Sequence, residues 1–142
     1  MIVAAIALFA LAPFTDQSSK VERARAFVEL LLVHPEQAST LATSDAVLVA
    51  GDIGVSMAEF LATNKPPASW IGDCHVGHLK EDSNASAKMA ADKDPPPWLK
   101  HGVPTFVEGT MSCTKVGKSA NVKIMVVLSD DKVAMFGLDR VQ

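Results

Sequence analysis

The sequence lacks a surplus of positive charge, and beyond residue 14 it lacks any long apolar run. Its 13 Lys and Arg residues are outnumbered by 16 Asp and Glu residues, which gives a formal charge of −3. Nucleic-acid-binding proteins carry a basic patch, so this composition argues against a nucleic-acid partner. A membrane-spanning helix needs about 20 apolar residues, and residues 15–142 offer no such stretch. Tyrosine is absent, and only two cysteines are present.

Residues 1–15 have the pattern of a secretory signal peptide. Residues 2–12 form an uninterrupted apolar run, which at 11 residues is too short to cross a bilayer. Residues 10–12, Ala-Leu-Ala, match the small-x-small pattern of a cleavage site. We therefore expect a signal peptide at residues 1–15, one domain at residues 16–142, and a periplasmic or secreted protein. The alternative is a buried N-terminal helix.

Helical signals come first in the expected domain. Ser19 and Glu22 have the spacing of a capping box, and apolar residues recur behind them at helical spacing. This pattern predicts a helix over residues 19–33. Pro35 can then open a second short helix that runs to residue 41.

A strand, a turn and a third helix are predicted next. Residues 45–50 are apolar and β-rich, which is typical of a buried strand. Residues 51–54, Gly-Asp-Ile-Gly, are interpreted as a turn. Ser56 and Glu59 repeat the capping-box spacing and start a short helix.

From Trp70 onwards the period changes to two, which predicts a long strand that includes Cys74. Residues 81–97 are polar and end in three prolines, which predicts a long loop that can include one helical turn. Three further strands, separated by compact turn signals, complete an antiparallel meander. They cover residues 105–116, 121–129 and 132–141.

Because side chains alternate along a strand, two apolar sets are each expected to face one side of the sheet. The first set is Val122, Ile124, Val126 and Leu128, and the second is Val133 and Met135.

The two cysteines, Cys74 and Cys113, fit an exported protein with one disulfide, whereas a cytosolic protein would keep them as buried thiols. If the strand that starts at Trp70 pairs antiparallel with residues 105–116, Cys74 lies opposite Cys113. The bond would close a loop of about 40 residues and stabilise the fold by about 3–4 kcal/mol through chain entropy.

This order of elements resembles the nuclear transport factor 2-like, or SnoaL-like, cone fold of the cystatin-like superfamily. The residues that carry the resemblance are the helix at 19–33, the strand, turn and helix at 45–61, and the hairpins at 114–128 and 132–141. The resemblance implies an α+β fold in which a strongly bent, mostly antiparallel sheet wraps around the long N-terminal helix and shorter helices. It also implies a short first strand at the sheet edge and an apolar pocket at the open end of the cone.

Such folds host isomerases, dehydratases, epoxide hydrolases, binding modules and oligomerisation domains, so the fold fixes no chemistry. Steroid isomerases of this superfamily use a helix tyrosine and an aspartate near the end of the first strand. This chain has no tyrosine, and the position of that aspartate falls near Ala50. Asp52 follows two residues later and becomes a candidate base only if the turn directs it inward; otherwise it is a turn residue.

Asp73, Cys74, His75 and His78 form the densest group of reactive side chains. On a strand, Asp73 and His75 share a face about 7 Å apart, which suits a carboxylate–imidazole pair for acid–base chemistry. Cys74 and His78 would lie about 13 Å apart, too far to bind one metal ion directly. The alternative to a catalytic pair is a solvated strand face. No metal and no other cofactor is expected.

The resemblance also places a pocket between the long helix, the helix after the first strand and the loop that closes the sheet. Asp52 and His75 are its nearest polar groups. Trp98, held by the three prolines before it, is expected either as a lid or as packing on the sheet edge. The predicted apolar lining is Phe27, Leu31, Met57, Phe60, Trp70 and Trp98.

Three functions follow as hypotheses. The first is an exported protein that binds a small apolar organic molecule without catalysis, as a homodimer formed through its sheet. The second is an isomerase, dehydratase or hydrolase that uses Asp52, Asp73 or His75 as general base. The third is a homodimeric interaction module. Neither nucleic acid nor, once the signal is removed, a membrane is expected as a partner.

Overall fold

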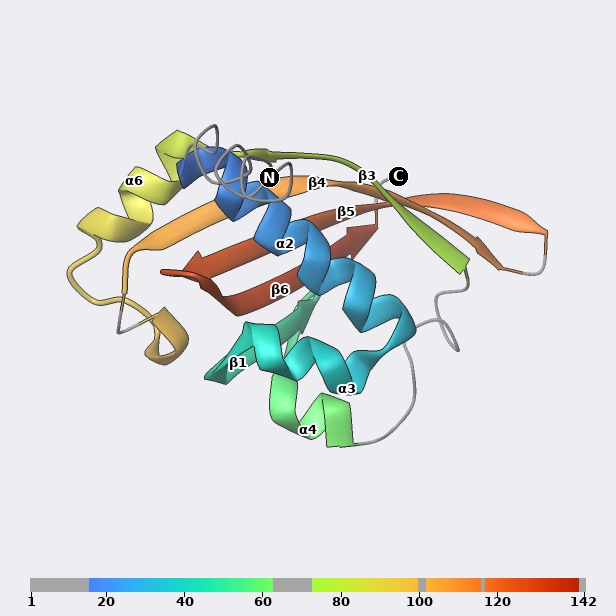
Figure 1. Ribbon diagram of the computed structural model, residues 1–142, viewed down its shortest axis with the longest axis horizontal. Coiled ribbons are helices and arrows are strands. Elements are labelled where there is room, and N and C mark those ends of the chain that lie inside the picture. The colour runs from blue at the N-terminus through green and yellow to red at the C-terminus, as the bar shows by residue number, and fades with distance from the viewer. Residues whose placement is uncertain (1–15, 63–72, 100–101, 116, 141–142) are drawn as a thin grey trace, which may run out of the picture.

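The structure, a computed structural model, describes residues 16–62, 73–99, 102–115 and 117–140. They form a curved six-stranded sheet with a long helix across one side (Figure 1). The helical elements are α2 (Asp16–Val33), α3 (Pro35–Ala38), η1 (Ser39–Leu41), α4 (Met57–Ala62), α6 (Ser83–Ala91) and η2 (Pro97–Leu99). The strands are β1 (Ala42–Ala50), β2 (Ile53–Ser56), β3 (Asp73–Glu81), β4 (Pro104–Lys115), β5 (Lys118–Ser129) and β6 (Lys132–Arg140). The predicted signal peptide at residues 1–15 lies outside the described residues.

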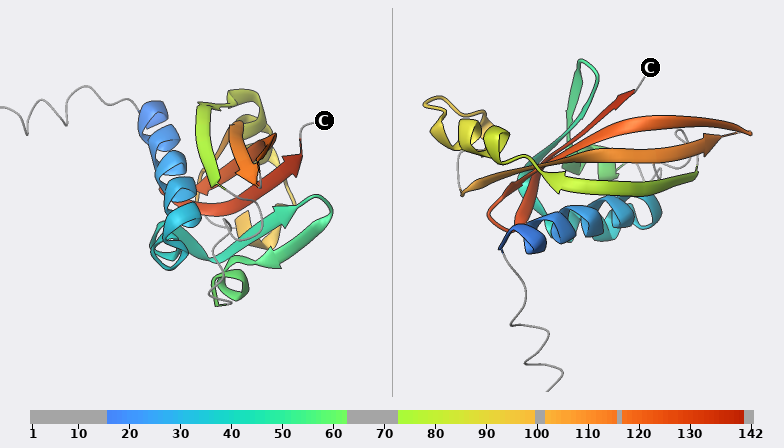
Figure 2. Two further views of the ribbon diagram at one scale, coloured as in Figure 1. Left: turned by 90° about the vertical axis from the view of Figure 1, so that its right-hand side faces the viewer. Right: turned by 90° about the horizontal axis from the view of Figure 1, so that it is seen from above.

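The strand order is β2-β1-β6-β5-β4-β3. Strands β3 to β6 form the antiparallel meander that the sequence predicts. Strand β1 pairs antiparallel with β2 and parallel with β6. The α+β fold class, with a bent and mostly antiparallel sheet wrapped around the long N-terminal helix, is therefore confirmed (Figure 2).

The prediction that the first strand lies at the sheet edge is wrong, because β2 occupies the edge beside it. Only Gly51 and Asp52 form the turn, and the chain then returns along β1 from Ile53. Gly51 adopts φ 60°, a left-handed conformation that glycine takes at little steric cost. Because the chain reverses within two residues, Ile53 and Gly54, which were interpreted as part of the turn, pair with β1 as a strand.

Helix α2 packs on the sheet through one apolar face, because its apolar residues recur every three or four positions. Phe27 meets Phe136 of β6 edge-on, with ring centroids 5.9 Å apart. The helix begins at Asp16, so the predicted cap at Ser19 lies inside it. The sequence between Asp16 and Ser19 has no glycine or proline that would stop the helix from extending backwards. The buried residues of α2 are Ala24, Phe27, Val28 and Leu31.

Two charged side chains of α2 bind the sheet at two separate places, the β5–β6 turn and the edge strand β3. Lys20 Nζ donates to the backbone oxygen of Asp130 at 2.6 Å and lies 3.0 Å from Oδ1 of Asp131, in the turn between β5 and β6. Arg25 Nη2 donates to the backbone oxygen of Gly77 in β3 at 2.7 Å. The helix therefore bridges the meander from its last turn to its edge strand.

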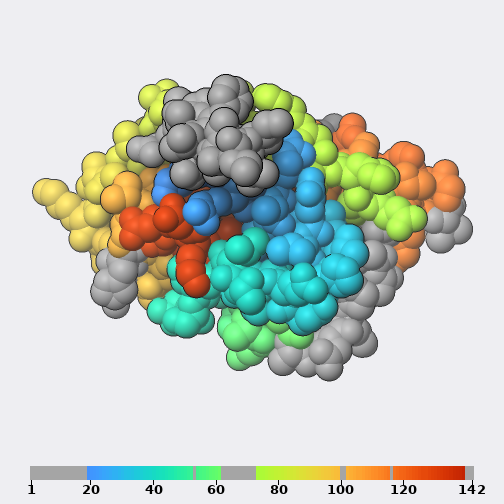
Figure 3. All heavy atoms as spheres, viewed as in Figure 1, coloured from blue at the N-terminus to red at the C-terminus, as the bar shows by residue number. Residues whose placement is uncertain are grey.

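The sheet has an inner face, which packs on α2, and an outer face. Val122, Ile124, Val126 and Leu128 all face one side of the sheet, as predicted, and this side is the inner core. The outer face carries a second cluster built on Leu99, Val127 and Met135. In the space-filling view, α2 and α3 (blue and cyan) cover much of the inner side, and the β4–β5 hairpin (orange) extends beyond them (Figure 3).

The prediction that Val133 and Met135 share one side of the sheet is wrong. Leu128 pairs with Val133, but Val127 pairs with Met135, so β6 has one extra residue at this point. Such a bulge reverses the alternation of the side chains that follow. Val133 consequently packs in the inner core and Met135 in the outer cluster.

Residues 83–91 form helix α6 where a long loop is predicted. The segment is rich in alanine, the strongest helix former. Asp82 precedes it as the cap, with its Oδ1 accepting a hydrogen bond from the backbone N–H of Ala85 at 3.0 Å. Met89 then packs against the outer cluster.

The disulfide between Cys74 and Cys113 is present, as predicted. Cys74 of β3 pairs in register with Cys113 of β4, and their Cα atoms are 4.0 Å apart. The bond joins the edge strand to its neighbour near the end of the meander. Among the described residues, no helix combines the length and the apolar character needed to cross a membrane.

Candidate ligand cavity

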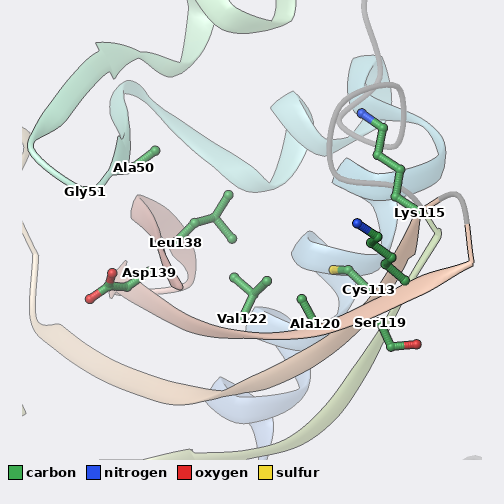
Figure 4. A pocket seen from close by; sticks show the side chains of 10 residues that line it. Ala50, Gly51, Cys113, Lys115, Ser119, Ala120, Val122, Leu138 and Asp139 are labelled. Atoms are coloured by element: carbon green, nitrogen blue, oxygen red, sulfur yellow. The ribbon is translucent and has the colours of Figure 1, made fainter. Parts of the chain in front are cut away.

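A cavity of about 470 Å³ lies where the end of β1 approaches the last residues of β4 and β6 and the first residues of β5 (Figure 4). It belongs to the part of the sheet that extends beyond α2. Its lining comes from four strands and the turn after β1. The lining residues are Ala50, Gly51, Cys113, Lys115, Lys118, Ser119, Ala120, Val122, Leu138 and Asp139.

The middle of the cavity wall is apolar. Cys113 and Leu138 are buried, with exposed fractions of 4% and 9%, and Val122 is half-buried. Ala120 stands opposite Cys113 in the β4–β5 register. In Figure 4 these side chains follow one another along the sheet, with Ala50 across from Leu138. A molecule in the cavity would therefore meet mainly methyl groups and sulfur.

Lysines stand at the hairpin end of the cavity because of the strand register. Lys115 and Lys118 are directly opposite each other in the last pair of the β4–β5 ladder. Side chains two residues apart on a strand share a face, so Lys115 lies on the face of Cys113, and Lys118 on the face of Ala120. The sequence analysis placed a compact turn between the strands at 105–116 and 121–129 and missed these lysines. Lys115 lies two residues after Cys113, and Lys118 lies on the other side of the turn. This spacing is the signal that could have found them.

One carboxylate, that of Asp139, belongs to the described lining. Asp139 is exposed and stands opposite Lys123 in the β5–β6 register. Figure 4 shows its carboxylate pointing away from Leu138 and Val122. The cavity therefore has two cationic side chains and one acidic side chain directed elsewhere, in a protein whose overall charge is −3.

The predicted pocket residues lie elsewhere in the described structure. Phe27, Leu31 and Met57 are fully buried in the inner core, and Phe60 packs against it. Trp98 packs on the outer cluster, on the opposite side of the sheet. None of these five residues lines the cavity. Trp70 lies outside the described residues.

The three candidate bases do not come together. Asp52 is exposed in the β1–β2 turn, next to Gly51 of the cavity lining. Asp73 and His75 are exposed on β3, where they pair with Thr114 and Ser112. These positions alternate with the disulfide pair, so both side chains belong to the outer face. Among the described residues, no three His, Cys, Asp or Glu side chains are grouped to hold a metal ion.

Comparison with known proteins shows similarity in the fold. No protein-family model matches the chain. No curated protein matches its sequence. Solved structures do resemble it, at low sequence identity.

Three of these structures illustrate the range. A candidate ketosteroid isomerase from Kribbella flavida is 16% identical, with a TM-score of 0.59 and coverage of 90% of this chain and 82% of that one. A de novo designed protein of the nuclear transport factor 2 fold is 15% identical, with a TM-score of 0.52 and coverage of 85% and 83%. An epoxide hydrolase from M. tuberculosis is 11% identical, with a TM-score of 0.54 and coverage of 89% and 86%. The chain has the nuclear transport factor 2-like fold.

Proposed function

We propose that this protein of nuclear transport factor 2-like fold binds a small, mainly apolar organic molecule in the cavity and does not transform it. The observation that carries the proposal is the apolar wall formed by Cys113, Val122 and Leu138. A cavity of about 470 Å³ also falls within the range of small-molecule sites, about 300–1,000 Å³. Burial of the ligand against this wall would supply most of the affinity.

The composition of the lining favours binding over catalysis. A general base must come within hydrogen-bond reach of the proton it removes. The predicted bases Asp52, Asp73 and His75 are not among the lining residues, and the carboxylate of Asp139 points away from the apolar wall. The lining residues of the described chain include no histidine.

The proposed function is tested with the neutral apolar dye Nile red. Ala120 is exposed and its small side chain stands beside Val122 in the cavity wall, so Ala120→Trp fills the cavity without disturbing the core. We expect the variant to weaken dye binding at least tenfold, measured by fluorescence titration, with little change in Tm. Ala90→Trp, at an exposed position of α6, is the matched control and keeps the affinity of the original chain. Equal dye binding by Ala120→Trp would refute the assignment of the cavity.

The second candidate function is an enzyme of the isomerase, dehydratase or hydrolase type. The similar structures described as a candidate ketosteroid isomerase and an epoxide hydrolase favour it. In that case Asp52, the predicted base closest in sequence to the cavity lining, is the first residue to test. Turnover of an epoxide or a ketosteroid that disappears in Asp52→Asn would support catalysis. Turnover that survives in this variant would exclude this role for Asp52.

We also propose that the protein acts in the periplasm or outside the cell. The disulfide supports this location, because disulfides persist in oxidising compartments. Expression of the full chain in a bacterial host, followed by fractionation and mass measurement of the N-terminus, tests it. Cleavage near residue 15 with product in the exported fraction is expected, whereas an intact N-terminus in the cytosol would contradict it.

A further inference from the structure

We infer that Asn84, in the first turn of α6, is an acceptor site for an N-linked glycan. The inference goes beyond the proposed function and uses only the proposed location outside the cytosol. Residues 84–86, Asn-Ala-Ser, have the Asn-x-Ser/Thr pattern of a glycosylation acceptor, with no proline at the middle position. The other two asparagines of the sequence, Asn64 and Asn121, have no serine or threonine two residues later.

The Asn84 side chain is exposed and has no hydrogen-bonding role in the described structure, where it contacts no described donor or acceptor. Helix propensity alone would favour alanine at this position, as at several others of α6. Ala87, Lys88 and Ala91 follow Asn84 at helical spacing on the same face of α6, and all three are exposed. Two of these three side chains are single methyl groups, so a sugar attached to Asn84 meets little obstruction.

Ser86, the third residue of the pattern, attaches α6 to the sheet. Its hydroxyl donates to the backbone oxygen of Asp82 at 2.9 Å and accepts from the backbone N–H of Phe106 in β4 at 2.8 Å. The backbone N–H of Asp82 in turn donates to the backbone oxygen of Phe106 at 2.8 Å. The glycosylating enzyme recognises the same serine hydroxyl, which the folded protein already uses twice. The transfer therefore belongs to the time before α6 packs on β4, while the chain is being exported.

The transfer needs a sugar donor of one chemical class, an oligosaccharide linked to a polyprenyl lipid through a diphosphate. A bond forms between Nδ2 of Asn84 and the anomeric carbon of the first sugar. The bond between that carbon and the diphosphate oxygen breaks, so that the lipid diphosphate leaves. The amide nitrogen gives up one proton, and no group is oxidised or reduced.

A glycan on α6 would lie far from the cavity. Helix α6 is attached beside the start of β4, whereas the cavity lies at the β4–β5 hairpin, at the opposite end of the sheet in Figure 1. Along β4, Phe106 and Cys113 are roughly 23 Å apart at about 3.4 Å per residue. Glycosylation should therefore leave the affinity for Nile red unchanged.

The test is secretion of the full chain from yeast behind an established secretion leader, so that entry into the secretory pathway does not depend on residues 1–15. We expect most secreted molecules to carry a glycan. Peptide N-glycosidase should remove it and leave aspartate at position 84, which peptide mass spectrometry detects. Asn84→Gln should be secreted without a glycan. Asn121→Gln, at another exposed position, is the matched control and should keep it.

Two further measurements separate the acceptor pattern from the fold. Ser86→Thr preserves the pattern and should keep the glycan, whereas Ser86→Ala should lose it. The folded chain, purified without a glycan, is then offered to detergent-solubilised oligosaccharyltransferase, with a short acceptor peptide as positive control. It should gain at least tenfold less glycan than the secreted chain carries, because the Ser86 hydroxyl is occupied.

A secreted chain without a glycan, or a glycan that persists in Asn84→Gln, would overturn the inference. Equal modification of the folded chain would overturn the order of transfer and folding. Nile red binding is measured on the chain without a glycan, so the proposed function stands or falls independently of these results.

Discussion

At the scale of single residues, the disulfide is the feature that the sequence predicts most directly. Two cysteines on strands of alternating pattern could be placed opposite each other because register follows from the antiparallel order of the strands. Cys74 and Cys113 do pair in this way. The cavity lysines were missed for a related reason. Their shared face becomes visible only when the pairing of Lys115 with Lys118 is known.

Loss of the disulfide should destabilise the domain by about 3–4 kcal/mol, since the bond closes a loop with a sequence separation of 39 residues. Cys74→Ala/Cys113→Ala tests this in a chemical denaturation experiment. Thiol titration of the original chain, unfolded without reductant, should find no free thiol. A loss below about 1 kcal/mol would contradict the entropic estimate.

Asp131 should make stability depend on pH. Its hydrogen bond and charge interaction with Lys20, and the charge of Arg23, hold the pKa of Asp131 below its ordinary value of 3.8. A carboxylate whose pKa is lowered by folding contributes stability above its unfolded pKa, and this contribution is lost as the pH falls through the folded pKa. The original chain should therefore melt above Asp131→Asn at pH 6, with the difference vanishing in strong acid and shrinking in high salt. A Tm difference that is independent of pH would contradict this origin.

At the scale of elements, the meander could be predicted because polar turn residues separate strongly β-forming runs. Strand β2 could not, because Ile53-Gly54-Val55-Ser56 is short and contains a glycine, so local pattern alone gives it no strand signal. Helix α6 was missed because its apolar residues do not recur at helical spacing. Two helix signals are nevertheless present in this segment, since Asp82 is a helix cap and alanine is a strong helix former. The bulge that separates Val133 from Met135 arises from pairing between strands and leaves no mark in a single strand's pattern.

Trp98→Ala can show whether the Trp98 side chain packs the η2 segment onto the sheet or covers the cavity as a lid. The indole belongs to the outer cluster with Leu99, Val127 and Met135, on the side of the sheet opposite α2. Trp98→Ala should therefore lower the stability by about 1–3 kcal/mol, because the side chain is half-buried. Binding of Nile red per folded molecule should stay unchanged. Weaker binding with an unchanged Tm would restore the predicted lid.

At the scale of the whole molecule, the cone fold could be predicted from the order of elements, but the position of its free space could not. Phe27, one of the predicted pocket aromatics, instead fills the space between α2 and the sheet, where it packs against Phe136. The space remains where the β4–β5 hairpin extends beyond the helix, where small side chains such as Ala50 and Ala120 stand. The position of the free space depends on the volumes of side chains from several elements, and these cannot be inferred from the local sequence pattern. The homodimer stays a prediction, which sedimentation equilibrium would test.

The central claim is that a small, mainly apolar molecule occupies the cavity, and chemical-shift mapping of the backbone amides during titration with the neutral ligand octanamide tests it most directly. We predict saturable shifts concentrated at Gly51, Ala120, Val122 and Leu138, with little change at Asp73 and His75 on the outer face. Shifts that instead centre on Asp73 and His75, or no saturable shift at any concentration, would contradict the claim.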